Sequence, residues 1–236
     1  MQTVSHSPAV PIKGISSMAT RQLLAELVAQ YCRGTDAVVE IESVGGVDAA
    51  KRVLAGEAFD VVVLASDAID KLVASGRVDA ASKVDLVVSG VSVAVQAGTA
   101  HPDLSSEDAV RNAVLAASSI SYSTGPSGVA LVKLFERWGI AEQIQSRIVQ
   151  APPGVPVGSL VARGEVALGF QQLSELIHLQ GIEVVGPLPP AIQILTTFSA
   201  GVCTGSPQAD GVRAMLDFMH SPAADAAKRK QGMEPA

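Results

Sequence analysis

The sequence is poor in aromatic residues, charged residues and cysteines. Aromatic side chains make up 3% of the 236 residues and charged ones 17%, whereas apolar residues make up 48%. The core must therefore be built from Val, Ala, Leu and Ile. Val-rich runs beside Ala-rich segments are typical of parallel strands buried under helices on both faces. A disordered chain is excluded, because disorder goes with low hydrophobicity.

Metal-binding and catalytic motifs are also missing. Cys32 and Cys203 are far apart and form no CxxC motif, which argues against a zinc site and predicts two small core residues. There is no phosphate-binding P-loop, no GxSxG motif and no dinucleotide-binding GxGxxG motif. We therefore expect neither a metal nor an organic cofactor.

The charge balance and the apolar runs exclude two kinds of partner. The net charge is −6 and no basic stripe is present, which argues against nucleic-acid binding. Local backbone dipoles can still hold an anion. The apolar runs are too short and too interrupted for membrane insertion. Residues 1–7 lack the features of a signal peptide, so we expect a periplasmic protein if a leader was removed and a cytoplasmic protein otherwise.

Strand and helix patterns alternate along the first third of the chain. Predicted strands at 9–15, 37–41 and 60–64 are each followed by a loop and a helical pattern. This alternation predicts a parallel sheet with right-handed crossovers. Two long β-prone runs, at 84–96 and 192–204, are predicted to cross between two lobes. The predicted fold is α/β, with two interleaved lobes, each a mainly parallel sheet flanked by helices, joined by a two-strand hinge.

The lobes are predicted to be interleaved because no Gly/Ser linker separates them. Lobe I takes residues 1–88 plus 197–236, and lobe II takes residues 89–196. Further strands are expected in lobe II near 120–122, 148–149, 166–170 and 182–185.

Four loops between predicted strands and helices can aim free backbone N–H groups and side-chain donors at one point. First-turn N–H groups have no helical partner, and the helix dipole favours an anion there. One such loop is an ordinary cap, but four of them, divided between two lobes, predict an anion site in the cleft. Arg21, one turn into the first helix, can reach over it. The other candidate ligand-binding residues are Ser16, Ser17, Ser43, Gly45, Gly46, Ser66, Tyr122, Ser123, Thr124, Ser127, Gly128, Gln171 and Gln172.

Three stretches resemble the periplasmic molybdate-binding protein family, a branch of the type II solute-binding proteins. They are 16–18 (SSM), 50–67 (AKRVLAGEAFDVVVLASD) and 160–172 (LVARGEVALGFQQ), within a resemblance that runs from Pro11 to about Lys230. The resemblance implies the two-lobed fold. It also implies an oxyanion held by a serine after each of the first two strands, by backbone N–H groups at two helix starts, and by a tyrosine.

Two of the side-chain donors implied by this resemblance are replaced here. Ser17 matches the first serine, but the second serine falls at Gly46 and the tyrosine at Gln172. An organic carboxylate is therefore expected on equal terms with a molybdate-like oxyanion. The helix starts that match are Ser127 with Gly128, and Pro156 with Val157 and Gly158.

The sequence leaves functions of different classes open. The first is a solute-binding protein that closes around its anion, with an ABC-transporter permease as partner if the protein is exported. The alternative is a cytoplasmic isomerase of an unsaturated organic acid, because some proteins resembling this family isomerise aconitate. An isomerase needs a general base, for which Ser17, Tyr122 or Asp67 are the candidates. A third is a ligand-sensing domain that acts on another chain.

Overall fold

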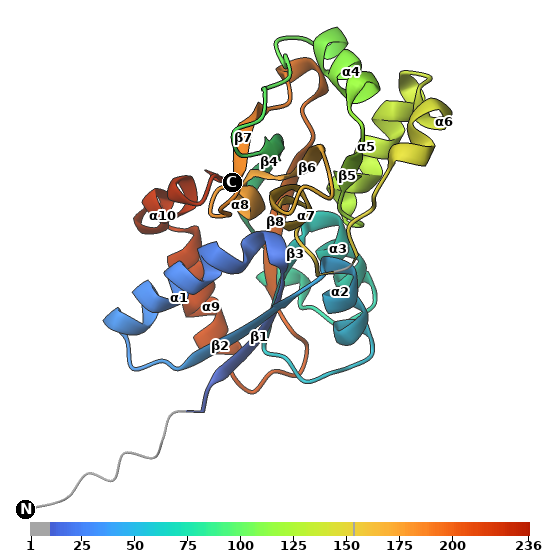
Figure 1. Cartoon of the computed structure of the whole chain (residues 1–236). Helices are drawn as coiled ribbons and strands as arrows, with labels where there is room; N and C mark the ends of the chain where they lie inside the picture. The colour runs from blue at the N-terminus through green and yellow to red at the C-terminus, as the bar shows by residue number, and fades with distance from the viewer. Residues whose placement is uncertain (1–9, 153) are drawn as a thin grey trace, which may run out of the picture.

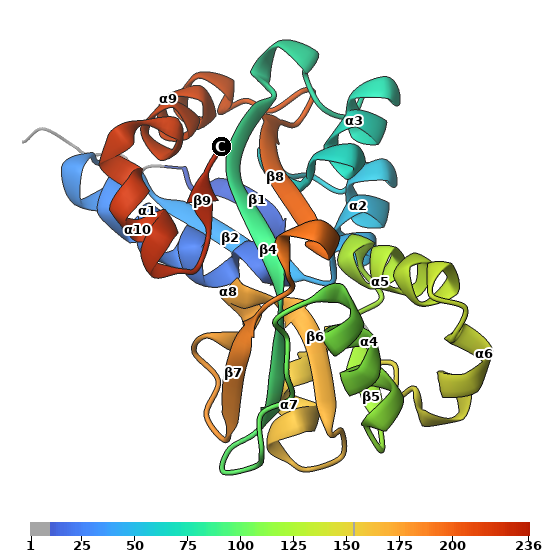
Figure 2. The ribbon, with the colours of Figure 1, turned by 90° about the horizontal axis from the view of Figure 1, so that it is seen from above.

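The structure, a computed structural model, describes residues 10–152 and 154–236 and consists of two α/β lobes (Figures 1 and 2). Two strands cross between them. The first half of β4 (Val84–Gln96) pairs antiparallel with β8 (Leu195–Val202), and its second half pairs with β6 (Leu168–Gln172) and β7 (Ile182–Pro187). The predicted α/β fold with a two-strand hinge is confirmed. The sheet of lobe II is not mainly parallel as predicted, because β6 and β7 both pair antiparallel with the crossing strand β4.

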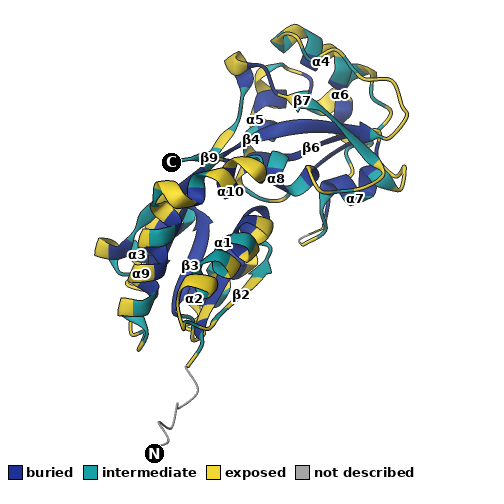
Figure 3. Cartoon of the chain, turned by 90° about the vertical axis from the view of Figure 1, so that its left-hand side faces the viewer, coloured by how far each residue is buried: buried dark blue, intermediate teal, exposed yellow. Residues whose placement is uncertain are grey.

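Lobe I is built on parallel strands. β1 (Ile12–Ser17) lies between β2 (Val39–Val44) and β3 (Val61–Ala65), and β8 pairs antiparallel with β3. All of β3 is buried, as its unbroken apolar sequence requires (Figure 3). The covering helices are α1 (Arg21–Gly34) and α9 (Ala209–His220) on one face, and α2 (Gly46–Leu54) and α3 (Ser66–Ala74) on the other.

Lobe II continues the sheet in the order β4, β6, β5, with β5 (Ile120–Tyr122) parallel to β6. Phe135 lies at the centre of the core of this lobe. The ring centroids of Tyr122 and Phe170 are each 6.2 Å from the ring centroid of Phe135, and both rings are edge-on to it. The helices of this lobe are α4 (Glu107–Ala116), α5 (Pro126–Arg137), α6 (Ala141–Ile144), α7 (Val157–Ala162) and α8 (Leu173–Leu176).

Short elements complete the chain. The first helix is preceded by a 3₁₀ turn, η1 (Met18–Thr20), and the C-terminal segment forms α10 (Asp225–Lys230) and the short strand β9 (Glu234–Pro235). The other 3₁₀ turns are η2 (Ala80–Ser82), η3 (Gln145–Arg147), η4 (Pro190–Ile192) and η5 (Pro222–Ala224). Over residues 10–152 and 154–236, no helix is long and apolar enough to cross a membrane.

Several predicted boundaries were wrong, and sheet pairing explains each error. The predicted loop at 16–17 is the end of β1, since both residues pair with β2. Gln171 and Gln172 end β6 instead of opening a helix, because both pair with β4. The predicted strand at 148–149 is reduced to an isolated bridge between Ile148 and Ile120. The predicted start of the first strand, at Ala9, lies outside the described residues.

We propose that the lobe boundaries lie where the sequence places them, with 1–88 plus 197–236 in lobe I and 89–196 in lobe II. The hydrophobic clusters support this division. Two clusters draw on residues up to 87 and from 198 onward, and two others draw only on residues 91–192. Among the described residues, no cluster mixes these two sets. Each lobe therefore has its own core, as hinge motion requires.

The two free thiols lie in different environments. Cys203 is buried, and burial together with the nearby Asp60 carboxylate raises the pKa of its thiol to about 12. Cys32, on α1, is half-buried. Because the thiolate is the reactive form, we expect a disulfide reagent at pH 8 to label Cys32 but not Cys203 in the native protein. Both should react after unfolding in guanidinium, and rapid native labelling of Cys203 would contradict its placement.

Candidate functional site

The lobe I side of the candidate site lies at the carboxyl ends of β1, β2 and β3. Ser17 ends β1, and its buried Oγ has no hydrogen-bond partner among the described residues. Helices α2 and α3 begin at Gly46 and Ser66 without a side-chain cap. A Cβ built on Gly46 would lie 3.5 Å from the Cβ of Ser17. The Ser17 side chain therefore lies beside the uncapped start of α2, whose N-cap residue is Gly45.

The lobe II side begins with the turn that leads into α5. The hydroxyl of Ser123 accepts a hydrogen bond from the N–H of Gly125 at 3.4 Å, which shapes the turn, whereas Thr124 is exposed. Pro126 takes the first helical position, where its missing N–H costs nothing. Ser127 and Gly128 follow in the first turn and are buried. Because they lie in the first turn, their backbone N–H groups have no acceptor within the helix.

Helix α7 brings a second helix start of lobe II close to β6. Pro156 is its N-cap, and Val157 and Gly158 are buried in its first turn. The N–H of Gly158 donates to Oε1 of Gln171 at 3.3 Å. Among the described residues, no acceptor takes the N–H of Val157. Gln171 thus fixes α7 on β6 and leaves one backbone donor for a ligand.

Gln172 connects the candidate site to the hinge. Its Nε2 donates to Oγ1 of Thr196 on β8 at 2.9 Å, and its buried Oε1 has no partner among the described residues. The hydroxyl of Thr196 can donate as well as accept. After a 180° rotation of the amide, Oε1 would accept a hydrogen bond from Oγ1 of Thr196, and Nε2 would take the position of the oxygen that has no partner. Gln172 can offer a donor to an anion where a tyrosine hydroxyl was implied.

Three predicted residues lie apart from Ser17. The hydroxyls of Ser16 and Ser43 bond to each other at 2.8 Å. Side chains alternate along a strand, so Ser16 lies on the face of β1 opposite to Ser17. Arg21 is exposed and, with Ser43, lines an open groove of about 490 Å³ between α1 and β2. This groove is otherwise lined by Leu24, Ala25, Val28, Val39 and Ile41.

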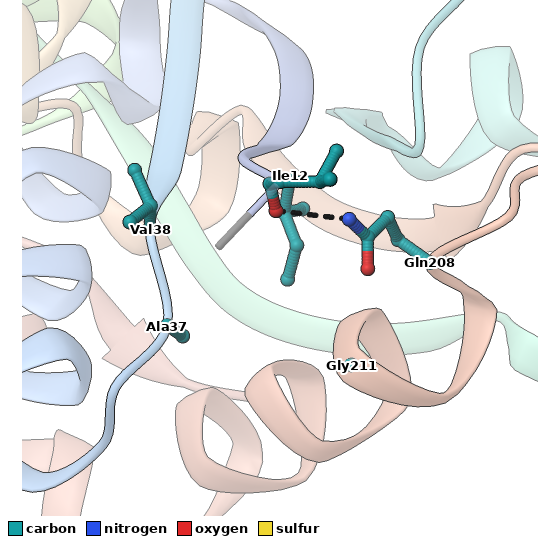
Figure 4. A pocket seen from close by; sticks show the side chains of 6 residues that line it. Ile12, Ala37, Val38, Gln208 and Gly211 are labelled. Atoms are coloured by element: carbon teal, nitrogen blue, oxygen red, sulfur yellow. Dashed lines mark hydrogen bonds between the residues drawn. The ribbon is translucent and has the colours of Figure 1, made fainter. Parts of the chain in front are cut away.

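A second hollow, of about 320 Å³, lies at the start of β1, at the opposite end of the strand from Ser17 (Figure 4). Nε2 of Gln208 donates to the carbonyl of Val10 across it at 2.9 Å. None of its lining residues is charged, so it offers little to an anion. They are Val10, Ile12, Ala37, Val38, Gln208 and Gly211.

The candidate bases differ in their surroundings. Asp67 is exposed, with its Oδ2 3.7 Å from Nζ of Lys71. Burial raises the pKa of Tyr122, whose ring packs on Phe135, so its hydroxyl stays protonated at neutral pH. Ser17 has no basic partner among the described residues that would activate it. None of the three combines a carboxylate or imidazole with a sheltered position.

Sequence reasoning missed a better candidate, Glu175 on α8. Its Oε1 accepts a hydrogen bond from Nε2 of Gln171 at 2.8 Å. Burial raises the pKa of this carboxyl to about 7, and the bond from Gln171 opposes the rise. A glutamate in the first turn of a helix is an ordinary partner of the helix dipole, so nothing in the sequence distinguishes Glu175 as a candidate.

Two α/β lobes joined by crossing strands, with uncapped helix starts in each, have the architecture of a type II solute-binding protein. The chain belongs to the bacterial extracellular solute-binding protein family, whose sequence profile matches residues 12–234. Among the described residues, no cluster of His, Cys, Asp and Glu side chains could hold a metal ion.

Known proteins with this fold bind different ligands. The periplasmic molybdate-binding protein of Azotobacter vinelandii is 22% identical, with a TM-score of 0.79 over 95% of this chain and 99% of that one. The sulfate-binding protein SubI of Mycobacterium tuberculosis is 16% identical, with a TM-score of 0.78 over 96% and 87%. In sequence, an aconitate isomerase of Pseudomonas sp is 36% identical over 234 residues, which cover 97% of this chain and 89% of that protein.

Proposed function

We propose that the chain binds a small organic polycarboxylate of the aconitate class between its lobes. The observation that carries this proposal is the buried hydroxyl of Ser17, which has no partner among the described residues and lies beside the uncapped start of α2. Leaving such a hydroxyl without a partner costs about 1–3 kcal/mol, which a carboxylate oxygen accepting a hydrogen bond from it would offset. The helix starts at Ser127 and Val157 supply N–H donors from the opposite lobe.

Two features favour a carboxylate over molybdate. Gly46 and Gln172 stand where the resemblance to molybdate-binding proteins implies a serine and a tyrosine. The likeness to an aconitate isomerase, at 36% identity over nearly the whole chain, also supports an organic acid. In the role of a solute-binding protein, bending of β4 and β8 would close the lobes around the acid. An ABC permease would then be the partner, and the protein would work outside the cytoplasmic membrane.

A second candidate function is isomerisation of the bound acid. Glu175 favours it, because a sheltered carboxylate with a pKa of about 7 is suited to proton transfer at neutral pH. The same aconitate isomerase relative supports this activity. Interconversion of cis- and trans-aconitate, followed by NMR, tests it directly.

Replacing Ser17 with alanine should weaken acid binding while stabilising the free protein. A hydrogen bond from the hydroxyl to a carboxylate is worth about 1.5–3 kcal/mol, so the Kd should rise roughly 10- to 100-fold. Loss of an unpaired buried hydroxyl should raise the free energy of unfolding by about 1 kcal/mol. Calorimetric titration with cis-aconitate, trans-aconitate, citrate, tricarballylate, molybdate and sulfate measures the first effect, and urea unfolding measures the second.

Ser121→Ala is the matched control. Ser121 is buried too, and its hydroxyl likewise has no partner in the part of the chain that the structure describes, but it lies inside β5 rather than beside a helix start. Its replacement should give the same gain in stability and leave the Kd unchanged. Equal Kd values for wild type and Ser17→Ala would remove Ser17 from the site. Binding of molybdate or sulfate, but of no carboxylate, would refute the assignment to organic acids.

A further inference from the structure

Glu175 lies where lobe II meets the start of the first helix of lobe I. Helix α8 packs against β4, β6 and η1, and η1 directly follows Ser17. Glu175 is also three residues beyond Gln172, at the end of β6. Contacts with η1 on one side and with the end of β6 on the other bring α8 to both halves of the candidate site.

A short chain of hydrogen bonds holds the Glu175 carboxylate in place. Gly158, in the first turn of α7, donates to Oε1 of Gln171, whose Nε2 donates to Oε1 of Glu175. Gln171 is almost fully buried, so this chain is rigid. Oε2 of Glu175 makes no hydrogen bond to the described residues, and the residue is half-buried. One oxygen is therefore anchored, whereas the other has no hydrogen-bond partner among the described residues.

Among the residues that the structure describes, no charged side chain offsets the burial of this carboxylate. Of the elements with the most extensive packing against α8, β6 and η1 carry no titratable group, and β4 carries only Asp85, which accepts a hydrogen bond from Ser199. The C-terminal segment contacts Leu173 of α8 at Gly232, and its Lys228 and Lys230 are paired with Asp225 and Glu26. His178, just beyond α8, is bonded to Gln231. A lone sheltered carboxylate of this kind fits proton transfer better than an ion pair.

We propose that Glu175 is the catalytic base that moves the proton when the chain isomerises a bound unsaturated tricarboxylate. The proposal rests on the isomerase activity put forward above. The raised pKa of Glu175, about 7, places a substantial fraction of the carboxylate in the basic form at neutral pH.

The proton transfer is balanced without a cofactor. Oε2 of Glu175 takes a proton from the methylene carbon of the acid, and the electron pair of that C–H bond spreads over the neighbouring double bond. The resulting allylic anion is stabilised by the adjacent carboxyl groups and by helix-start N–H donors. Glu175 then returns the proton to the former vinylic carbon. The double bond has moved, and the carboxylate is regenerated.

Glu175→Gln tests the proposal, because its amide oxygen can still accept the bond from Gln171. We expect isomerisation of trans-aconitate to slow by at least about 100-fold, with a similar loss of deuterium uptake at the methylene carbon in D₂O. The Kd for tricarballylate, a saturated analogue that cannot isomerise, should stay unchanged. The wild-type rate should rise with pH to a plateau above about 7, and Glu175→Asp should retain partial activity.

Glu142→Gln serves as the control, since Glu142 is an exposed glutamate on α6. If Glu175→Gln keeps the wild-type rate, Glu175 is not the base, while the isomerase function stands. If the wild type binds tricarballylate but neither isomerises nor exchanges, both the base and the isomerase are overturned and the binding function remains. If the wild type binds no acid, the proposed function itself fails. Should Glu175→Gln not fold, Glu175→Asp decides, because an unchanged rate and pH profile would contradict the proposal.

Discussion

Gly128→Ala is expected to abolish acid binding and to lower the free energy of unfolding by about 3 kcal/mol. A Cβ at this position would lie 1.8 Å from the backbone oxygen of Ser123 and 2.9 Å from its carbonyl carbon. Neither atom belongs to a flexible side chain, so the turn at 123–125 must move away from α5. That movement would displace the first-turn N–H groups of α5 that are proposed to hold the acid.

Gly34→Ala is the matched control for this substitution. Gly34 is also helical, as the last residue of α1, and a Cβ there would meet nothing within 4 Å. Alanine should be neutral at that position or slightly stabilising, since it reduces the freedom of the unfolded chain. Urea unfolding and calorimetric titration with cis-aconitate measure both variants. Similar stabilities and affinities for the two would show that the turn and α5 are not in close contact.

The hinge could be predicted from the sequence because it depends on local properties. The runs at 84–96 and 192–204 are β-prone and longer than an ordinary strand, and they correspond to β4 and β8. The helix starts could be predicted for the same reason, since Gly and Ser before an apolar periodic segment mark where a helix begins. Gly45 and Gly46, in front of the apolar residues of α2, are an example.

The remaining parts of the candidate site depend on how strands pair, which the sequence does not reveal. Ser16 and Ser17 are neighbours in the chain, but the pairing of Ser16 with Ser43 turns their side chains to opposite faces. Gln171 and Gln172 separate in the same way, toward α7 and toward Thr196. The two pairs look like loop donors in the sequence, but in each pair the neighbouring side chains face opposite ways, so both members cannot contact one ligand in the same way.

Glu175 could not be identified because its chemistry comes from burial. In the sequence it is one of several acidic residues in the first turn of a helix. What distinguishes it is the packing of α8 against β4, β6 and η1, which removes water from around the carboxylate. Packing between segments far apart in the chain also explains why Asp67, which follows a clear buried strand, was a candidate and is instead exposed.

Burial of Glu175 leads to a second large effect, on stability. Glu175→Gln should raise the free energy of unfolding by about 3 kcal/mol at pH 8 and leave it unchanged at pH 4.5. The carboxyl has a pKa of about 7 in the folded protein, against 4.5 as the ordinary value. Between these values the unfolded chain loses the proton while the folded chain keeps it. The stability that the protonated carboxyl provides is therefore fully present below pH 4.5 and lost as the pH rises through 7.

Glutamine resembles the protonated carboxyl at every pH. The free energy of unfolding of the variant should therefore not fall as the pH rises from 4.5 to 7 on account of this position. Urea unfolding of the wild type, Glu175→Gln and Glu142→Gln at half-unit steps from pH 4.5 to 8 measures the difference. Other titrating groups cancel in the comparison, and the exposed Glu142 should give a curve parallel to the wild type. A Glu175→Gln curve that is also parallel would mean that the carboxylate is well solvated. The expected divergence would instead show that burial of Glu175 destabilises the folded protein at neutral pH, the cost expected of a carboxyl whose pKa is raised for proton transfer.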